Sequence, residues 1–133
     1  MKTTRSSGLI LHITSLPGPF GIGDLGPEAY KFADLLVKCG FKYWQLLPLN
    51  PIEESTGYSP YSSTSAFAGN AMLISPELLV KDGYLEKKDL ETKPAFKTGA
   101  VEYDEAIRYK KSLLRKAFEQ FQKNPEQEKK ICF

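Results

Sequence analysis

Two short apolar runs separated by one amphipathic segment are the feature of this sequence that most constrains its fold. The runs, at residues 8–13 and 41–49, are apolar almost throughout and are bounded by glycine or proline. Such runs predict strands buried on both faces, as in parallel sheets. The segment between them, residues 27–39, has about the length that a parallel crossover helix requires. The sequence therefore predicts a strand–helix–strand unit and an α/β parallel sheet.

The segment at residues 27–39 also carries signals for where a helix begins and ends. Asp24 or Gly26 can cap its N-terminus, and Pro27 suits the first helical position. Gly40 is a typical residue to end a helix. The apolar residues share one face, which predicts packing against the sheet. They are Ala29, Phe32, Ala33, Leu36 and Val37.

A stretch rich in small and hydroxyl side chains follows the second apolar run. Residues 57–70 read GYSPYSSTSAFAGN, which places tyrosines on both sides of a Ser-Pro pair. Tyrosine rings stack on flat faces and hydroxyl groups bind polyhydroxylated ligands, so the composition suits a ligand-facing loop. Its position agrees, since parallel-sheet enzymes bind ligands beyond the C-terminal ends of their strands. A surface turn set by Gly57, Pro60 and Gly69 is the alternative from composition alone.

His12 lies near the C-terminal end of the first predicted strand. A histidine in such a run is more often a hydrogen-bonded core residue than a catalytic base. Barrel enzymes, however, keep their sites at that end of their strands. Both interpretations stay open on the sequence.

Glycines at positions 21, 23 and 26 have the G-x-G-x-x-G spacing of a dinucleotide-binding fingerprint. That fingerprint opens directly from a strand, whereas a Pro-Gly-Pro loop at residues 17–19 intervenes here. No acidic residue ends the next strand to hold a ribose. A dinucleotide ligand is therefore not expected.

The second half of the chain predicts helices. A short helix is expected at residues 76–80, a further turn at 85–90, and a long amphipathic helix at 103–123 that Asn124 and Pro125 end. The other face of the long helix is basic, and we predict that water solvates this face. The basic residues are Arg108, Lys110, Lys111, Arg115 and Lys116.

Composition excludes several classes of partner. The chain has 133 residues, of which 41% are hydrophobic, and this is enough for one domain with a core. Lys and Arg total 18 against 16 Asp and Glu, far from the concentrated basic charge of nucleic-acid-binding proteins. No apolar run is long enough to span a membrane, and no secretory core follows the first five residues. We therefore expect a cytoplasmic protein without nucleic-acid or membrane partners.

Cys39 and Cys132 have no metal-binding spacing, and His12 is the only histidine that could join them. The sequence thus supports neither a zinc site nor a disulfide framework. Free thiols are the expected state, and no metal or organic cofactor is expected.

Several motifs follow one another in a fixed order along the chain. They are RSSG at residues 5–8, LHITSLPGP at 11–19, GIGDLG at 21–26, YWQLLPL at 43–49, SPY at 59–61 and SAFAGN at 65–70. Taken in order, they closely resemble the start of glycoside hydrolase family 77, the amylomaltases and disproportionating enzymes, which are 4-α-glucanotransferases. The resemblance is strong to about residue 85, and beyond it only the pattern of a long helix agrees.

The resemblance implies a (β/α)8 TIM barrel whose first two strands are those predicted above. Residues 1–52 would then hold these strands and the intervening helix. Residues 53–133 would form the substrate loop and a mainly helical insertion. A complete barrel needs about 250 residues. We therefore expect the chain to be an N-terminal portion that needs the rest of the barrel for a complete site.

The chemistry implied is transfer of an α-1,4-glucan segment between maltooligosaccharides by a retaining double displacement. In that mechanism one carboxylate is the nucleophile and a second carboxylic acid protonates the leaving oxygen. The family takes these groups from later strands, so the resemblance assigns no catalytic residue to this chain, and Asp24, Glu53 and Glu54 inherit no such role. The chain alone is predicted to be inactive.

Substrate contacts are the roles that the resemblance does transfer. Tyr61 would stack on the sugar ring beside the scissile bond, and Ser59 would hydrogen-bond glucan hydroxyls. Tyr58 is a weaker candidate for a neighbouring subsite. The alternative function is a stand-alone, non-catalytic maltooligosaccharide-binding module that uses the same tyrosine loop.

Overall fold

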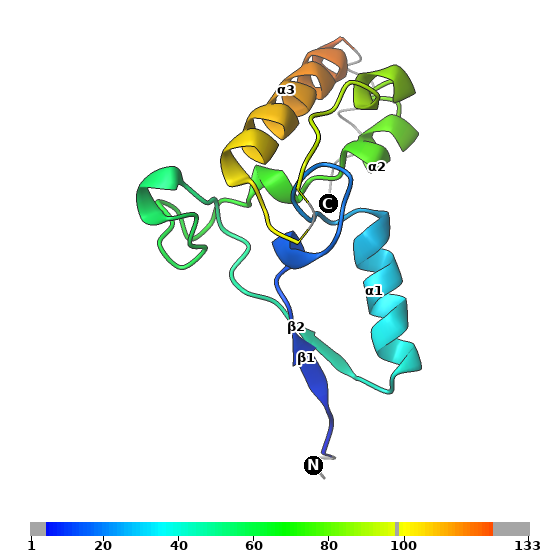
Figure 1. The fold of residues 1–133 in the computed structure, drawn as a ribbon, viewed down its shortest axis with the longest axis vertical. Helices are drawn as coiled ribbons and strands as arrows, with labels where there is room; N and C mark the ends of the chain where they lie inside the picture. Colours follow the sequence, from blue (N-terminus) through cyan, green and yellow to red (C-terminus); the bar gives the residue numbers. More distant parts are fainter. Residues whose placement is uncertain (1–4, 98, 124–133) are drawn as a thin grey trace.

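The computed structural model describes residues 5–97 and 99–123 as a small parallel sheet below a group of helices (Figure 1). The strands are β1 (Gly8–Ile10) and β2 (Tyr43–Gln45), and the helices are α1 (Pro27–Lys38), α2 (Pro76–Lys81) and α3 (Tyr103–Gln122). Short 3-10 turns connect them at η1 (Ile13–Ser15), η2 (Glu54–Thr56), η3 (Ala71–Leu73) and η4 (Lys87–Leu90). Within these described ranges, no helix has the length and apolar character needed to cross a lipid bilayer.

The strand–helix–strand unit is confirmed. β1 and β2 pair in parallel, with Leu9 opposite Trp44, and α1 makes the crossover between them. The backbone N–H of Leu11 continues the ladder by donating to the carbonyl of Gln45 at 3.2 Å. Gly8 allows this close pairing, because a Cβ at its position would lie 2.9 Å from the Cβ of Tyr43.

The prediction that both strands are buried on both faces is wrong. Ile10 is 62% exposed and Tyr43 is 65% exposed. Among the described residues the sheet has only these two strands, and α1 covers one face, where Phe32 meets the Trp44 ring edge-on at 4.9 Å. The apolar runs therefore supply more hydrophobic surface than the described part of the chain covers.

Helix α1 begins and ends where the sequence predicts. Gly26 is its N-cap, Pro27 occupies the first turn, and Gly40 beyond its end has a positive φ of 79°. Ala29 and Leu36 are buried as expected, but Val37 is 74% exposed. A two-stranded sheet contacts only a narrow stripe of a helix, which explains why Val37 at the edge of the apolar face has no cover.

One of three core clusters in the described residues lies beyond the ends of the strands. Ile13 belongs to the first apolar run, but it leaves the strand and is fully buried against Leu16, Ala29 and Leu73. Trp44 joins this cluster from the side, and its indole N–H donates to the carbonyl of Leu11 at 2.8 Å. The core therefore fixes the path of the chain where it leaves the sheet.

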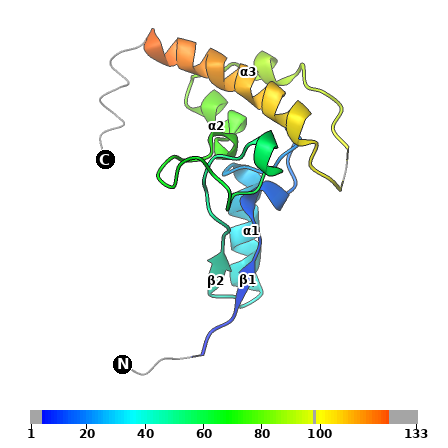
Figure 2. The same cartoon turned by 90° about the vertical axis from the view of Figure 1, so that its left-hand side faces the viewer.

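Helix α3 crosses the end of the molecule opposite the sheet (Figure 2). Its apolar face is buried through Ala106, Leu113 and Ala117, as the periodicity predicts. Helix α2 packs beside it. The helix ends at Gln122, and the predicted stop signal at positions 124–125 lies outside the described residues.

The prediction of a fully solvated basic face is wrong at one position. Lys110 is fully buried, and its Nζ donates to Asp24 Oδ2 at 2.8 Å and to the carbonyl of Met72 at 2.7 Å. Lys110 lies four residues after Ala106 and three before Leu113, on the buried stripe of α3. Its partners replace the water that it loses.

The glycines of the fingerprint-like spacing serve packing. A Cβ at Gly23 would lie 2.1 Å from the Ile13 carbonyl oxygen, and a Cβ at Gly26 would lie 2.4 Å from the Ser75 Oγ. The backbone N–H of Gly23 also donates to the carbonyl of Thr14 at 3.1 Å. The close approach of backbone atoms at Gly23 and of side-chain atoms at Gly26, not a phosphate group, explains why glycine stands at these positions.

We predict that Gly23→Ala lowers the free energy of unfolding by about 3 kcal/mol, because the crowded atoms are backbone atoms that cannot rotate away. Denaturant unfolding measures the change. Gly69→Ala is the matched control: nothing lies within 4 Å of its Cβ position, and its effect should stay within about 0.5 kcal/mol. Equal effects of the two substitutions would contradict the packing account.

Candidate functional site

The candidate site is the loop at residues 50–69, which leaves the end of the second apolar run and returns to nearly the same point. Its base is closed by Asn70, whose backbone N–H donates to the Leu49 carbonyl at 2.8 Å. The buried side chain of Asn70 also accepts a bond from the Met72 N–H at 2.9 Å. In Figure 1 the loop (green) stands out from the side of the molecule. Its two arms are therefore held together at the point where they join the core.

Hydrogen bonds within the loop define its shape. Glu53 is the central acceptor: its carbonyl receives the Tyr58 N–H at 2.9 Å, and its Oε1 receives the Thr64 hydroxyl at 3.0 Å. Gly57 sits in the left-handed region with φ 63°, as the turn interpretation requires. The loop is thus a set of turns, and its outward side chains are free to be presented to a ligand.

Tyr61 and Ser59 are placed together on this loop. The Tyr61 residue is 70% exposed, and its backbone N–H donates to Ser59 Oγ at 3.3 Å. Ser59 is half-buried. By accepting this hydrogen bond, its hydroxyl oxygen holds the backbone of Tyr61. The arrangement presents an aromatic ring on a fixed backbone, which suits stacking on a flat apolar face.

Tyr58 has a different environment. Its ring stacks on Tyr103, with ring centres 4.6 Å apart and planes 10° from parallel, and its hydroxyl donates to Asp104. It is the only non-glycine residue of the described chain with a positive φ, at 59°. The hydrogen bond to the Asp104 carboxylate, followed by desolvation, raises the pKa of Tyr58 to about 12. The ring therefore ties the loop to the start of α3.

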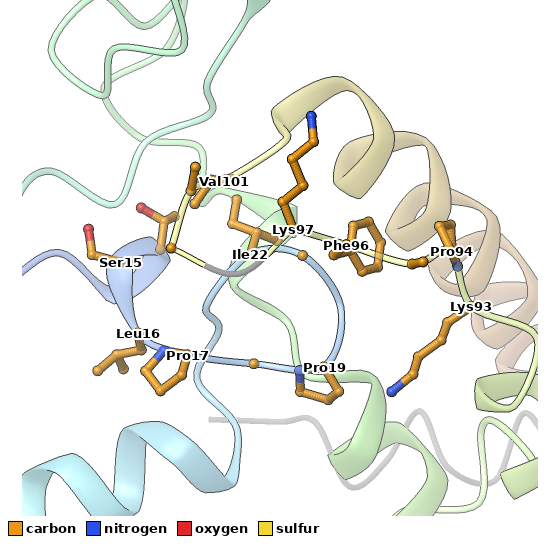
Figure 3. Close-up of a pocket in the computed structure, with 16 residues that line it drawn as sticks. Ser15, Leu16, Pro17, Pro19, Ile22, Lys93, Pro94, Phe96, Lys97 and Val101 are labelled. Carbon is orange, nitrogen blue, oxygen red and sulfur yellow. The ribbon is translucent and has the colours of Figure 1, made fainter.

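Three hollows lie on the surface of the described residues. The largest, of about 740 Å³, is drawn in Figure 3; Pro17 and Pro19 line it from the loop after η1, and Pro94 and Phe96 from the segment before α3. A second, of about 590 Å³, lies beside Tyr58. A third, of about 400 Å³, lies at the base of the loop. Neither Ser59 nor Tyr61 lines any of these three hollows.

The titratable groups do not assemble catalytic machinery in the described ranges. His12 is buried as a core residue, its Nδ1 has no hydrogen-bond partner there, and desolvation lowers the pKa of its imidazole. Asp24 forms a salt bridge with Lys110. No group of three or more His, Cys, Asp or Glu side chains in the described residues could hold a metal ion. Cys39 is an exposed free thiol, and Cys132 lies outside the described residues.

Comparison with known proteins decides the family. Residues 11–133 match the glycoside hydrolase family 77 model, described as 4-alpha-glucanotransferase. The chain belongs to this family. It is 51% identical over 119 residues to the 4-alpha-glucanotransferase of Aquifex aeolicus, a match that covers 90% of this chain and 24% of that protein. It is 44% identical over 135 residues to the enzyme of Thermus thermophilus, covering 100% of this chain and 25% of that protein.

A solved structure of the family also matches the fold. The amylomaltase from Streptococcus agalactiae, in complex with acarbose, superposes with a TM-score of 0.84 at 42% identity. The match covers 90% of this chain and 24% of that chain. The chain thus spans about a quarter of the length of the glucanotransferases that it matches.

Two features around the candidate loop were missed by the sequence reasoning. The Tyr103 and Asp104 partners of Tyr58 lie more than forty positions away, and no local pattern pairs them with the loop. Lys110 had a usable signal, since it occupies the same helical stripe as Ala106, Leu113 and Ala117. Applying the helical periodicity to Lys110 would have predicted that its side chain is buried.

We predict that Asp104→Asn moves the pKa of Tyr58 from about 12 toward about 10, because the carboxylate that stabilises the neutral phenol is removed. A raised folded-state pKa means that the bond favours folding below pH of about 10 and that this contribution is lost as the pH rises to about 12. A tyrosinate absorbance titration measures the shift.

Tyr58→Phe assigns the signal in that titration. The assignment is needed because burial also raises the pKa of Tyr109. A late-titrating tyrosine that disappears in Tyr58→Phe but is unchanged in Asp104→Asn would show that Asp104 is not the cause.

Proposed function

We propose that this chain forms part of the sugar-binding site of a 4-α-glucanotransferase that transfers α-1,4-glucan segments between maltooligosaccharides. The observation that carries the proposal is the match, at 42% identity and a TM-score of 0.84, to an amylomaltase in complex with acarbose. Acarbose resembles a short maltooligosaccharide, so the ligand of that enzyme indicates the class of substrate. The named relatives are transferases, which gives the alternative of a stand-alone binding module no support.

Tyr61 is the residue we propose to stack on a glucose ring. Its ring is exposed, its backbone is fixed by Ser59, and the loop base is closed by the bond from Asn70 to Leu49. A pyranose presents a face of C–H groups that packs well on an aromatic ring, while its hydroxyls need polar partners. Ser59 would supply such a partner, and Tyr58, which lines a hollow of about 590 Å³, would border a neighbouring subsite.

We propose further that β1 and β2 are the first two strands of a (β/α)8 barrel. Their parallel pairing, the crossover helix α1 and the exposed apolar residues Ile10 and Tyr43 support this, because a barrel supplies a strand to each edge and covers both faces. In this proposal residues 1–52 belong to the barrel, and residues 53–133 form the substrate loop and a helical insertion at its C-terminal face.

Catalysis in this proposal is retaining and uses two carboxyl groups that the described residues do not supply. Asp24 is neutralised by Lys110, and Glu53 holds the loop through Thr64. In the proposed mechanism the nucleophile and the acid/base come from other parts of the glucanotransferase.

Tyr61→Ala tests the proposal in the polypeptide encoded by the complete reading frame around these residues, hereafter the full polypeptide. Loss of an aromatic sugar contact of about 1.5–3 kcal/mol should lower kcat/KM for maltotriose disproportionation about 10- to 100-fold. Tyr61→Phe should keep most of the activity, because the ring remains.

Tyr30→Ala is the matched control, since Tyr30 is also an exposed tyrosine but lies on α1, away from the loop. Its kcat/KM should be unchanged. A Tyr61→Ala variant as active as the wild type would overturn the assignment of Tyr61. A folded full polypeptide that binds maltotriose without transferring glucose units would favour the binding module instead.

A further inference from the structure

Helix α3 holds both arms of the candidate loop. Near its start, Tyr103 and Asp104 contact Tyr58 on the outgoing arm, one residue before Ser59. Two turns later, Lys110 binds the carbonyl of Met72, just beyond the returning arm. These contacts bring together segments that are distant in sequence, and one rigid element carries all of them.

The contact at Lys110 reaches the loop through a short chain of hydrogen bonds. Lys110 Nζ donates to the Met72 carbonyl at 2.7 Å, and the Met72 N–H donates to Asn70 Oδ1 at 2.9 Å. The Asn70 N–H then donates to the Leu49 carbonyl at 2.8 Å, which closes the loop. The buried ammonium therefore fixes the residue that joins the two arms.

Asp24 fixes the ammonium in turn. Its carboxylate accepts from Lys110 at 2.8 Å, and the pair is almost entirely shielded from water. The neighbouring Leu25 N–H donates to the Leu73 carbonyl at 2.9 Å, so the turn before α1 also contacts η3. Lys110 thus sits where α3, η3 and the turn before α1 meet.

The spacing on α3 sets the geometry of the loop. Asp104 and Lys110 are six residues apart, which corresponds to about 9 Å along a helix at 1.5 Å per residue. A helix does not stretch, so the anchor of the outgoing arm and the anchor of the returning arm keep a fixed separation. Ser59 and Tyr61 lie on the segment between these anchors.

We propose that Lys110 and Asp104 are positioning residues, which hold the Ser59–Tyr61 segment in the geometry that receives a glucose ring. The inference rests on the proposed function and adds residues that touch no sugar. It predicts that weakening either anchor loosens the loop selectively and raises KM for maltooligosaccharides more than it lowers kcat.

Lys110→Met in the full polypeptide tests the inner anchor. The thioether chain fills similar space but leaves the Asp24 carboxylate and the Met72 carbonyl without their donor. Hydrogen–deuterium exchange should rise at least about tenfold in peptides covering residues 57–70, with little change in α1. KM for maltotriose should rise about tenfold, with kcat changed less than about threefold.

Lys123→Met is the matched control, because it makes the same chemical change at an exposed residue at the other end of α3. Its loop exchange and KM should equal those of the wild type. Tyr58→Phe tests the outer anchor and removes only the hydroxyl that binds Asp104. It should raise loop exchange and KM in the same direction by about two- to fivefold, and it decides the matter if Lys110→Met does not fold.

The two proposals fail in distinguishable ways. A wild-type polypeptide without transfer activity removes the proposed function, while the exchange experiment still tests the anchors. Loop exchange that stays at the wild-type level in both variants overturns the positioning role. Exchange that rises equally in α1 and the loop overturns it as well, since Lys110 would then serve general stability alone.

Discussion

The buried ammonium of Lys110 is the interaction on which the arrangement of this chain depends. Removing a charge from water is costly, and burial lowers the pKa of Lys110 while the Asp24 carboxylate opposes that change. Removing one partner of such a pair costs about 3–5 kcal/mol, because the other is left buried and unpaired. The pair therefore requires α3, the turn before α1 and the segment after the loop to meet at one point. Few other placements of α3 would let the Lys110 ammonium contact both the Asp24 carboxylate and the Met72 carbonyl.

The sheet plays a smaller part in stability than its place in the sequence suggests. A two-stranded sheet is marginal alone, and here its outer surface stays exposed at Ile10 and Tyr43. One cluster of buried apolar residues instead lies where the chain leaves the strands, around Ile13 and Leu73, and two others lie around α3. The fold thus fixes the C-terminal end of the strands, where the loop stands, more firmly than the strands themselves.

The helices were predictable because their signals are local. Gly26, Pro27 and Gly40 act within a few residues of the ends of α1, and the apolar stripe of α3 repeats along one element. Burial of the strands was not predictable in the same way. An apolar run indicates that a surface tends to be covered, but it does not say whether the described part of the chain provides the cover.

The same distinction between local signals and contacts of distant segments applies to the candidate site. The loop could be found from its composition and its position after a strand, and Ser59 and Tyr61 do lie together on it. Their contact with sugar remains a prediction. The partners of the anchors could not be found, because the pairs of Tyr58 with Asp104 and of Lys110 with Asp24 depend on how α3 crosses the rest of the chain. The charge of Lys110 suggested that its side chain is exposed to solvent, whereas the helical periodicity places the residue on the buried face of α3.

A crystal structure of the full polypeptide with acarbose bound tests the central claim most directly. The account predicts a sugar ring packed on the face of Tyr61, with Ser59 within hydrogen-bonding distance of a sugar hydroxyl. It also predicts that the Lys110 ammonium keeps its bonds to Asp24 and Met72. Acarbose bound elsewhere, with the Tyr61 ring free in solvent, would contradict the assignment of the loop as a substrate contact.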